Sequence, residues 1–400
     1  MRILFVHEVN YLNKVIFEMH EFPELLALRG HKVSFFHYPE AADRPRVSLR
    51  TKTTRISGRV HPDAEIDLIT PPTFGGSRVE RYFAPLLACR ALRREVCSRG
   101  YDVIVLYSVP TTGWQTVAFA KRAGVPVVFR ALDVSHKIRR SFVGPLVRVV
   151  EKYIYRNATL LSANNPAMAD YCVELSGRVG PTVVNLPPVD FLHFDEQVEA
   201  DLRGELGLPR SAKVVLYMGT FFSFSGLDVV IAGMVEQFKR YPDLRLVLVG
   251  AGELDKALRD LVAQLGVSNR VIFTGVVPYA KLPQYLKLAD VAINPFRPEL
   301  LTHVALPHKV LQYMAAGVPT VSTSLRGLRG VLGEGSGVTW VDDPNGVANA
   351  ASALARENPS ALAAISRAQL DRVRARFSEE MAVASFEEAL RAVARHHVHD

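Results

Sequence analysis

The sequence predicts two doubly wound, Rossmann-like α/β domains that face each other across a cleft. One reason is length, because 400 residues are more than a single hydrophobic core usually organises. Another is that short apolar runs alternate with helical patterns in both halves of the chain. These runs are continuously apolar, which is typical of parallel strands covered by helices on both faces. Because such folds bind ligands at the carboxyl ends of their strands, we expect the functional site there.

Each expected strand is a short run of aliphatic and β-branched residues. In the first half the expected strands are 2–7, 32–37, 102–107, 125–129 and 159–163. In the second half they are 213–218, 244–250, 270–275, 290–295, 319–323 and 338–341. Residues 41–66, rich in Arg, Thr and Pro, are expected to form a long mobile loop.

A Pro pair and a change in charge near residue 190 mark the expected domain boundary. It divides an N-terminal domain, 1–195, from a C-terminal domain, 196–377. An amphipathic pattern predicts one last helix at 378–400, which we expect to join the N-terminal domain.

Composition argues against several classes of protein. A composition of 48% hydrophobic and 22% charged residues is typical of a soluble globular protein. No apolar run approaches the ~18–20 residues of a membrane-spanning helix. The short apolar run at the N-terminus is interpreted as a strand rather than a signal peptide. We therefore expect a cytoplasmic protein. Cys89, Cys97 and Cys172 have no metal-binding spacing and are expected to be reduced thiols. Since no zinc or Asp-x-Asp motif is present, we expect neither a metal nor another cofactor.

Positive charge is concentrated in the first half of the chain. Residues 1–190 contain 26 Lys and Arg against 17 Asp and Glu, whereas residues 191–400 contain 22 against 23. An anionic partner is therefore expected to meet the first half. Nucleic acid is disfavoured, because the basic residues are not interleaved with aromatic ones and no RNA-binding motif is present.

A predicted helix within 139–158 carries part of this charge. Its basic residues are Arg139, Arg140, Arg148, Lys152 and Arg156, and the last three recur every four residues on one helical face. The expected buried stripe is Leu146, Val149, Val150 and Tyr153. The basic face is either an ordinary solvated surface or a surface for anionic lipid or a phosphate-bearing acceptor. The second alternative would place the protein peripherally on the inner face of a membrane.

The segment LPHKVLQYMAAGVPTVST, residues 306–323, predicts a helix that holds an anion at its start. Pro307 suits the first helical position, where its missing N–H would be unpaired anyway, and Gly317 suits the end of the helix. The free N–H groups around His308 and Lys309 and the positive end of the helix dipole would then point to one place. Lys309 opposes that dipole unless an anion lies nearby. A phosphate ligand is the interpretation that accounts for this charge.

These segments together resemble the GT-B glycosyltransferases of the retaining, family-4 type. Residues 306–323 resemble that family's P-x-K-x-x-E-Y-M-A-A-G-x-P-V-V segment. VVLYMGTFFSFSGLDVVI (214–231) is similar to its first strand, glycine turn and helix, and 244–254 and 271–295 are similar to its next strands and loops. The resemblance extends, more weakly, over the first half. It implies a GT-B fold and a metal-independent transfer of a sugar, with retention, from a UDP- or GDP-sugar to an acceptor hydroxyl of a glycan, lipid-linked or small-molecule acceptor.

Carried over position by position, the resemblance implies a donor site in the second domain. The implied donor-binding residues are Gly219, Thr220, Gly250, Val276, Val277, Arg297, Pro307, His308, Lys309 and Gln312. Among these, Lys309 would hold the diphosphate and assist catalysis, with Arg297 as a second cation. The backbone at Val276 and Val277 would read the base, and Gln312 would face the ribose.

In the first domain, the strand that ends in RALDVSH (130–136) matches a strand that ends in His-Asp in many relatives. Asp133 fits the Asp and is expected to orient the acceptor hydroxyl, whereas Leu132 replaces the His. His136 is either a catalytic residue or a surface histidine.

Several positions depart from the family pattern. Thr220 and Ser225 stand where cations are common, and Gln312 and Val304 stand where acids are common. The alternatives are therefore a catalytically impaired, nucleotide-binding partner subunit of the same fold, or a nucleotide-sugar epimerase. A two-domain dehydrogenase is disfavoured, because neither first strand leads into G-x-G-x-x-G.

Overall fold

The structure is a computed structural model that describes residues 1–38, 48, 50–73, 80–138, 144–195 and 201–396. It divides into two compact units, which we describe separately. Unit 1 is Met1–Pro188 together with Glu379–Asp400, and unit 2 is Val189–Ser378. The sequence had placed these divisions at 195/196 and 377/378.

Unit 1 is built on an eight-stranded sheet in the order β3-β4-β2-β1-β5-β6-β7-β8. Its strands are β1 (Arg2–Val6), β2 (Lys32–Phe36), β3 (Lys52–Ser57), β4 (Glu65–Thr70), β5 (Val103–Leu106), β6 (Val127–Ala131), β7 (Leu160–Ala163) and β8 (Thr182–Val184). All neighbouring pairs are parallel except β3 and β4. The central strands β5, β6 and β7 are buried at every residue, as their continuous apolar sequence predicts.

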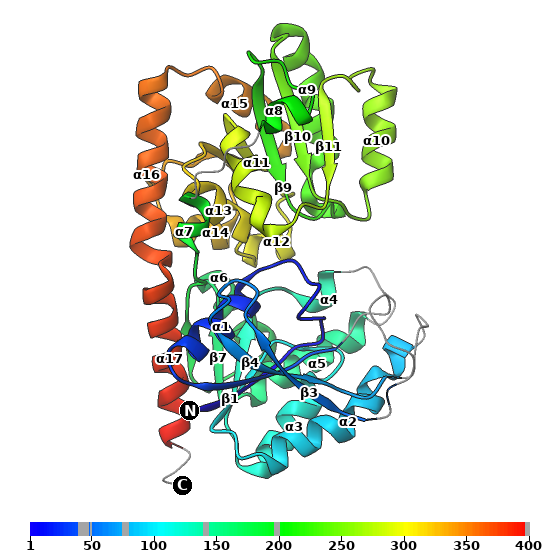
Figure 1. Cartoon of the computed structure of the whole chain (residues 1–400), viewed down its shortest axis with the longest axis vertical. Coiled ribbons are helices and arrows are strands. Elements are labelled where there is room, and N and C mark those ends of the chain that lie inside the picture. The colour runs from blue at the N-terminus through cyan, green and yellow to red at the C-terminus, as the bar shows by residue number, and fades with distance from the viewer. Residues whose placement is uncertain (39–47, 49, 74–79, 139–143, 196–200, 397–400) are drawn as a thin grey trace. The chain divides into compact units, whose positions relative to one another are not determined.

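Helices pack around this sheet (Figure 1). They are α1 (Glu18–Leu28), α2 (Glu80–Ser98), α3 (Gly113–Ala123), α4 (Ser135–Ile138), α5 (Gly144–Asn157), α6 (Pro166–Ser176) and the C-terminal α17 (Glu379–His396). Helix α17 packs on unit 1 through Val383, Phe386 and Leu390, which belong to the same core as β1 and α1. The expected last helix therefore forms, and its residues complete the core of the unit that contains the N-terminus.

Unit 2 contains a six-stranded, wholly parallel sheet in the order β11-β10-β9-β12-β13-β14. Its strands are β9 (Lys213–Met218), β10 (Leu244–Val249), β11 (Val271–Gly275), β12 (Val291–Asn294), β13 (Thr320–Thr323) and β14 (Thr339–Val341). Its α-helices are α7 (Phe191–Asp195), α8 (Leu202–Glu205), α9 (Leu227–Arg240), α10 (Asp255–Gln264), α11 (Leu282–Leu288), α12 (Leu300–Val304), α13 (His308–Ala315), α14 (Arg326–Leu332), α15 (Pro344–Leu354) and α16 (Pro359–Phe377). Two short 3-10 turns, η2 (Ser223–Ser225) and η3 (Tyr279–Lys281), complete it. The predicted class, two doubly wound α/β domains, is confirmed.

Two expectations about unit 1 are wrong. Part of the expected loop 41–66 lies outside the described residues, but Lys52–Ser57 form β3 and Glu65 begins β4. Strand β3 is a mostly exposed edge strand paired antiparallel with β4, so its polar sequence carries no apolar signal. The short edge strand β8 was also not predicted.

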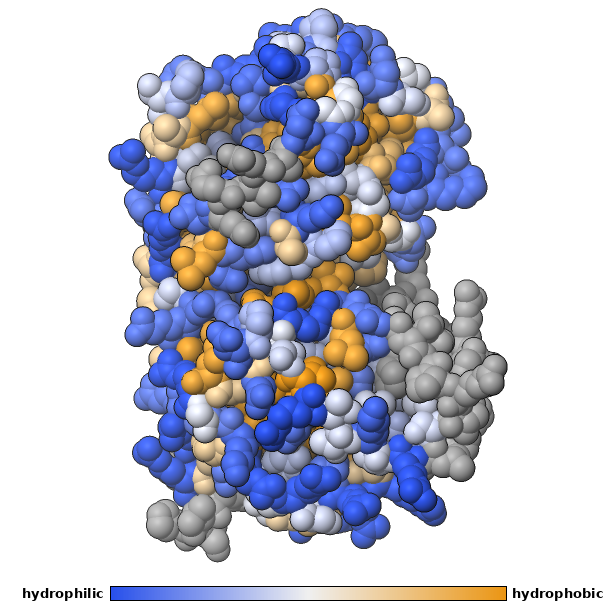
Figure 2. All heavy atoms as spheres, viewed as in Figure 1, coloured by the Kyte–Doolittle hydropathy of each residue, from blue (hydrophilic) through white to orange (hydrophobic). Residues whose placement is uncertain are grey.

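The surface follows the composition. Hydrophilic residues cover most of the face drawn in Figure 2, and hydrophobic residues reach it in smaller patches. Among the described helices, none combines the length and the apolar character needed to cross a bilayer.

Candidate functional site

In unit 2, two glycine loops meet where β9 and β10 end. Gly219 follows β9 with φ +139°, and Gly250 follows β10 with φ +134°, conformations that side-chain-bearing residues rarely adopt. A Cβ on Gly250 would lie 2.1 Å from the carbonyl oxygen of Gly219. The N–H of Gly219 donates to Val249 O at 2.9 Å, so the loops are joined backbone to backbone. Glycine at these positions lets the two main chains pack without a side chain between them.

The ammonium group of Lys309 lies beside this glycine loop. A Cβ on Gly219 would lie 2.9 Å from Lys309 Nζ, although the two residues are far apart in sequence. Nζ donates a hydrogen bond of 2.8 Å to Tyr217 Oη. It also lies 4.1 Å from the centre of the Tyr217 ring and 4.2 Å from that of Phe296. Lys309 is thus held by two aromatic rings and one hydroxyl.

No carboxylate pairs with Lys309 among the described residues. The side chain is partly buried, and burial lowers the pKa of Lys309 well below its usual value. An ammonium group in such surroundings gains stability from an anion, because burial of an unpaired charge is costly. The site is therefore electrostatically prepared for an anionic ligand.

Helix α13 carries Lys309 in its first turn. It begins at His308, and Pro307 is its N-cap with no side-chain hydrogen bond to the first turn. The expectation that Pro307 is the first helical residue is wrong by one position, because its ψ of 101° is extended rather than helical. At the other end Gly317 has φ +68°, as expected for the residue that stops a helix.

The other predicted donor-binding residues lie on loops and helices of unit 2. Thr220 is exposed, and its carbonyl accepts a hydrogen bond of 3.1 Å from Tyr217 Oη. Val276 is exposed and Val277 partly so, both just beyond the end of β11. Gln312 is buried on α13, three residues after Lys309.

Arg297 differs from the expectation of a free second cation. Its Nη2 lies 2.5 Å from Asp228 Oδ2, in a pair whose side chains are both partly exposed. Its backbone N–H donates to Phe224 O. The charge of Arg297 is therefore compensated within the protein, which leaves Lys309 as the cation that a ligand would find unpaired.

In unit 1, Asp133 stands two residues beyond the end of β6. Its side chain is exposed. The pKa of Asp133 is nevertheless raised to about 6, mainly because the surrounding groups reduce its hydration and secondly because the Glu18 carboxylate lies nearby. The carboxyl group is thus ionised at neutral pH and can accept a hydrogen bond from a hydroxyl.

His136 is not a surface histidine. Its side chain is 10% exposed, and Nδ1 shares a hydrogen bond of 2.5 Å with Oε2 of the fully buried Glu151. Burial raises the pKa of Glu151, and the contact with His136 opposes that effect. The ring is therefore held between α4 and α5 by a buried partner.

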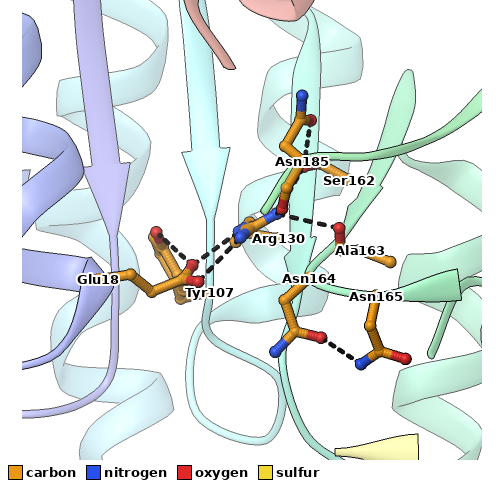
Figure 3. Close-up of polar contacts among 8 residues, drawn as sticks. All are labelled: Glu18, Tyr107, Arg130, Ser162, Ala163, Asn164, Asn165 and Asn185. Atoms are coloured by element: carbon orange, nitrogen blue, oxygen red, sulfur yellow. Dashed lines mark hydrogen bonds and ion pairs between the residues drawn. The ribbon is translucent and has the colours of Figure 1, made fainter. Parts of the chain in front are cut away.

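A buried ion pair that the sequence did not reveal organises the neighbouring strand ends. Figure 3 shows Arg130 of β6 pointing toward Glu18 of α1 on one side and toward Ser162 of β7 on the other. Its Nε and Nη2 donate to the two Glu18 carboxylate oxygens at 2.6 and 2.8 Å. Nη1 donates to Ser162 Oγ and to the carbonyl of Asn185. A charged residue within the apolar run VVFRA was the available signal.

The basic helix differs most from its prediction. Arg139 and Arg140 lie outside the described residues, and Arg148, Lys152 and Arg156 are exposed. The predicted buried stripe is wrong, because Leu146, Val149 and Tyr153 are exposed and Val150 is only partly buried. The buried residues of α5 are Glu151, Ile154 and Tyr155.

The part of the chain that the structure describes contains no metal-binding group and no disulfide. Within it, no three His, Cys, Asp or Glu side chains gather as a metal-binding group. Cys89, Cys97 and Cys172 are all free thiols.

Comparison with known proteins gives consistent matches over both units. Residues 212–357 match the family described as Glycosyl transferases group 1, and residues 19–188 match the Glycosyl transferase 4-like domain. A D-inositol 3-phosphate glycosyltransferase of Segniliparus rotundus is 30% identical over 389 residues, which cover 92% of this chain and 82% of that protein. The enzyme of the same name from Corynebacterium urealyticum is 30% identical over 229 residues, 54% of this chain and 53% of that protein. Most alignments of this kind span only about half of the relative's length.

Solved structures share the fold along nearly the whole chain. Sucrose-phosphate synthase from Thermosynechococcus elongatus superposes with a TM-score of 0.78 at 20% identity, covering 98% of both chains. Anabaena HepE, solved in complex with UDP-glucose, superposes with a TM-score of 0.72 at 18% identity and covers 98% of this chain and 100% of its own.

Proposed function

This chain belongs to the group 1 glycosyl transferases, with the GT-B fold, and we propose that it transfers a sugar from a UDP- or GDP-sugar to an acceptor hydroxyl with retention of configuration. Transfer breaks the bond between the anomeric carbon and the diphosphate and forms a new bond from that carbon to the acceptor oxygen. The diphosphate leaves with the bonding electrons, and the acceptor gives up its proton. The main task of the protein is therefore to stabilise negative charge on the leaving group.

The observation that carries this proposal is the unpaired ammonium of Lys309 beside Gly219. Glycine loops and a helix N-terminus let a diphosphate approach main-chain N–H groups closely. In the proposed complex, Lys309 and the N–H groups of His308 and Lys309 hold the diphosphate. The bound anion would raise the pKa of Lys309 toward its usual value and so stabilise its ammonium form.

The acceptor is proposed to bind at unit 1, with its hydroxyl oriented by the Asp133 carboxylate. The names of the curated relatives make inositol phosphates the first acceptors to test. The base, the sugar and metal independence are parts of the same proposal, and a chelator added to the assay tests the last of these.

The decisive experiment is a panel of nucleotide sugars, with release of UDP or GDP measured with and without acceptor. Lys309→Ala is expected to lower kcat/KM by about 30- to 1000-fold, corresponding to ~2–4 kcal/mol of transition-state stabilisation. The matched control is Lys256→Ala, because Lys256 is 87% exposed on α10 of the same unit and is expected to have no effect. Unchanged turnover in Lys309→Ala would remove this residue from the mechanism.

A second candidate is a partner subunit of the same family that has lost catalysis. It is favoured by the uncharged residues at Thr220 and Ser225 and by Gln312 in place of an acid. Calorimetry with UDP and GDP separates the two, since a protein that binds neither nucleotide at millimolar concentration cannot be the proposed transferase.

A further inference from the structure

The outer face of α5 exposes two adjoining stripes of side chains. The apolar stripe is Leu146, Val149 and Tyr153, which are 65%, 64% and 39% exposed. The basic stripe is Arg148, Lys152 and Arg156, all exposed. Spacings of three and four residues keep each stripe in line along the helix, with the basic stripe beside the apolar one. We call these six residues the α5 outer face.

Helix α5 presents this face from a fixed position. Its opposite side is buried through Ile154 and Tyr155, and Glu151 is fully buried against His136. Glu151 is the single acid in the sequence of this helix, so the outer face carries positive charge without an acid of its own. The exposed acids of the neighbouring α6 are Asp170 and Glu174. Neither forms an ion pair with the basic stripe, and the three cations have no ion-pair partner among the described residues.

We propose that the α5 outer face docks on an anionic lipid bilayer. Exposed Leu, Val and Tyr side chains gain free energy on leaving water for the acyl boundary of the bilayer. The adjoining Arg and Lys side chains pair with lipid phosphates, to which they are attracted within a Debye length. The net charge of +9 in residues 1–190 adds a longer-range attraction to the same surface.

Other partners satisfy only one of the two stripes. A symmetric dimer through this face would bring the same three cations against each other, which is unfavourable. A soluble polyanion would pair with the basic stripe but leave the apolar stripe in water. A bilayer with anionic headgroups accommodates both. This proposal goes beyond the proposed transfer reaction and does not depend on the identity of the donor or acceptor.

Sedimentation of the full-length chain with lipid vesicles tests the proposal. We expect binding to vesicles of phosphatidylcholine and phosphatidylglycerol in roughly equal amounts, and little binding to phosphatidylcholine alone. Replacing the basic stripe, Arg148→Gln with Lys152→Gln and Arg156→Gln, is expected to lower the partition coefficient on the order of a hundredfold at low salt. Replacing part of the apolar stripe, Leu146→Ser with Val149→Ser, is expected to lower it by roughly tenfold or more.

The matched control removes the same charge from another helix of unit 1. Arg90, Arg93 and Arg94 of α2 are exposed, and their change to Gln is expected to leave vesicle binding within a few-fold of the unaltered chain. Thermal unfolding verifies that all variants fold, which is expected because the altered side chains are exposed.

Four outcomes overturn the proposal. One is absence of binding to the anionic vesicles. Another is an equal loss of vesicle binding in the α2 control, which would show that net charge alone explains the binding. The third is binding to heparin that matches vesicle binding and is unaffected by the serine variant, which would indicate a soluble polyanion. If the serine variant instead converts a dimer to a monomer by sedimentation equilibrium while vesicle binding is unchanged, the face is a contact between copies and the bilayer is rejected.

Discussion

Asp133 is the residue whose proposed role is most open to a direct pH test. Loss of hydration and the Glu18 carboxylate raise its pKa to about 6, so it is ionised at pH 7 and becomes protonated as the pH falls through 6. The ionised form accepts the stronger, charge-assisted hydrogen bond from the acceptor hydroxyl. We therefore expect kcat/KM for the acceptor to fall below about pH 6. Asp133→Asn is expected to reduce it by about 100-fold at pH 7 and to abolish this acidic limb.

The measurement is a pH–rate profile of both proteins at saturating donor. Because Lys309 is in unit 2, Lys309→Ala serves as the comparison and should keep the acidic limb while losing rate. An acidic limb that persists unchanged in Asp133→Asn would assign it to another group.

Gly250 is predicted to tolerate substitution much less well than Gly317, although both have positive φ. An added Cβ at Gly250 would lie 2.1 Å from Gly219 O, whereas none of the atoms considered lies within 4 Å of one added at Gly317. Gly317→Ala is expected to cost ~1–2 kcal/mol, the ordinary cost of a left-handed residue. Gly250→Ala is expected to cost at least about 3 kcal/mol and to weaken nucleotide binding, because the Gly219 loop must move. Urea unfolding followed by Trp340 fluorescence measures both, and equal losses would contradict the close packing of the two loops.

The candidate site was predictable where local chemistry fixes a residue's place. Gly317 and Lys309 follow from a helix end and a helix start, which neighbouring residues indicate, whereas Gly219 was implied by the resemblance to the family. The contacts of Tyr217 and Phe296 with Lys309 were not predictable, because Tyr217 lies in β9 and Phe296 in the loop after β12. A Tyr within an apolar strand is usually interpreted as a core residue. Glu18 and Arg130 are 112 positions apart, so only the fold reveals that they pair.

At the scale of elements, α5 shows why an amphipathic pattern can be assigned to the wrong side. Its apolar residues fall on more than one side of the helix, and the periodicity alone favoured Leu146, Val149 and Tyr153 as the buried set. The fold instead buries Glu151, since His136 of α4 satisfies its carboxylate. A buried ionisable residue with a long-range partner is invisible to hydrophobic periodicity. Strand β3 was missed for the related reason that an exposed edge strand needs no apolar face.

Helix α17 follows unit 2 in the sequence but packs in the core of unit 1, so its substitution is expected to affect unit 1. Phe386 is fully buried and packs against Phe22 of α1, with the two rings tilted and their centres 4.5 Å apart. Phe386→Ala is expected to destabilise unit 1 by ~3–5 kcal/mol, the usual cost of a large cavity. Glu388→Ala is the control, since Glu388 is exposed on the same helix.

The two tryptophans allow the units to be followed separately. Trp114 lies in α3 of unit 1 and Trp340 in β14 of unit 2, so Trp340→Phe and Trp114→Phe variants each report one unit. Phe386→Ala should lower the urea midpoint reported by Trp114 and leave that reported by Trp340 nearly unchanged. The opposite pattern would show that α17 stabilises unit 2 instead.

At the scale of the whole molecule, the alternation of strands and helices was predictable where a strand is a short apolar run, but β3, β4 and β8 were missed. The contacts between residues far apart in sequence were less predictable. Glu387 of α17 bonds to His31 and Arg29, more than 350 positions away. Such contacts determine to which unit a helix belongs. Long-range contacts of ionisable residues also determine how the stability of each unit depends on pH.

Acid is expected to unfold unit 1 before unit 2. Burial lowers the pKa of both His20 and His37 to about 4. His37 is held neutral by two bonds, accepting from Tyr11 N–H at Nδ1 and lying 2.8 Å from Thr70 Oγ1 at Nε2. In the unfolded chain both rings take up a proton near pH 6.5, so the folded state loses stability as the pH falls below 6.5.

The loss is about 2 kcal/mol for each of these two histidines between pH 7 and pH 5. His7, whose pKa is lowered to about 3 by burial and then by Lys14, acts in the same direction within unit 1. The raised pKa values of Asp133 and Glu151 act in the opposite direction, because these groups bind protons more readily in the folded unit. We expect the three histidines to set the sign of the change. Urea titrations of the two single-tryptophan variants at pH 7 and pH 5 should therefore show a larger drop in midpoint for Trp114 than for Trp340. His37→Asn is expected to narrow that difference, and equal drops in both units would mean that the buried histidines do not control acid stability.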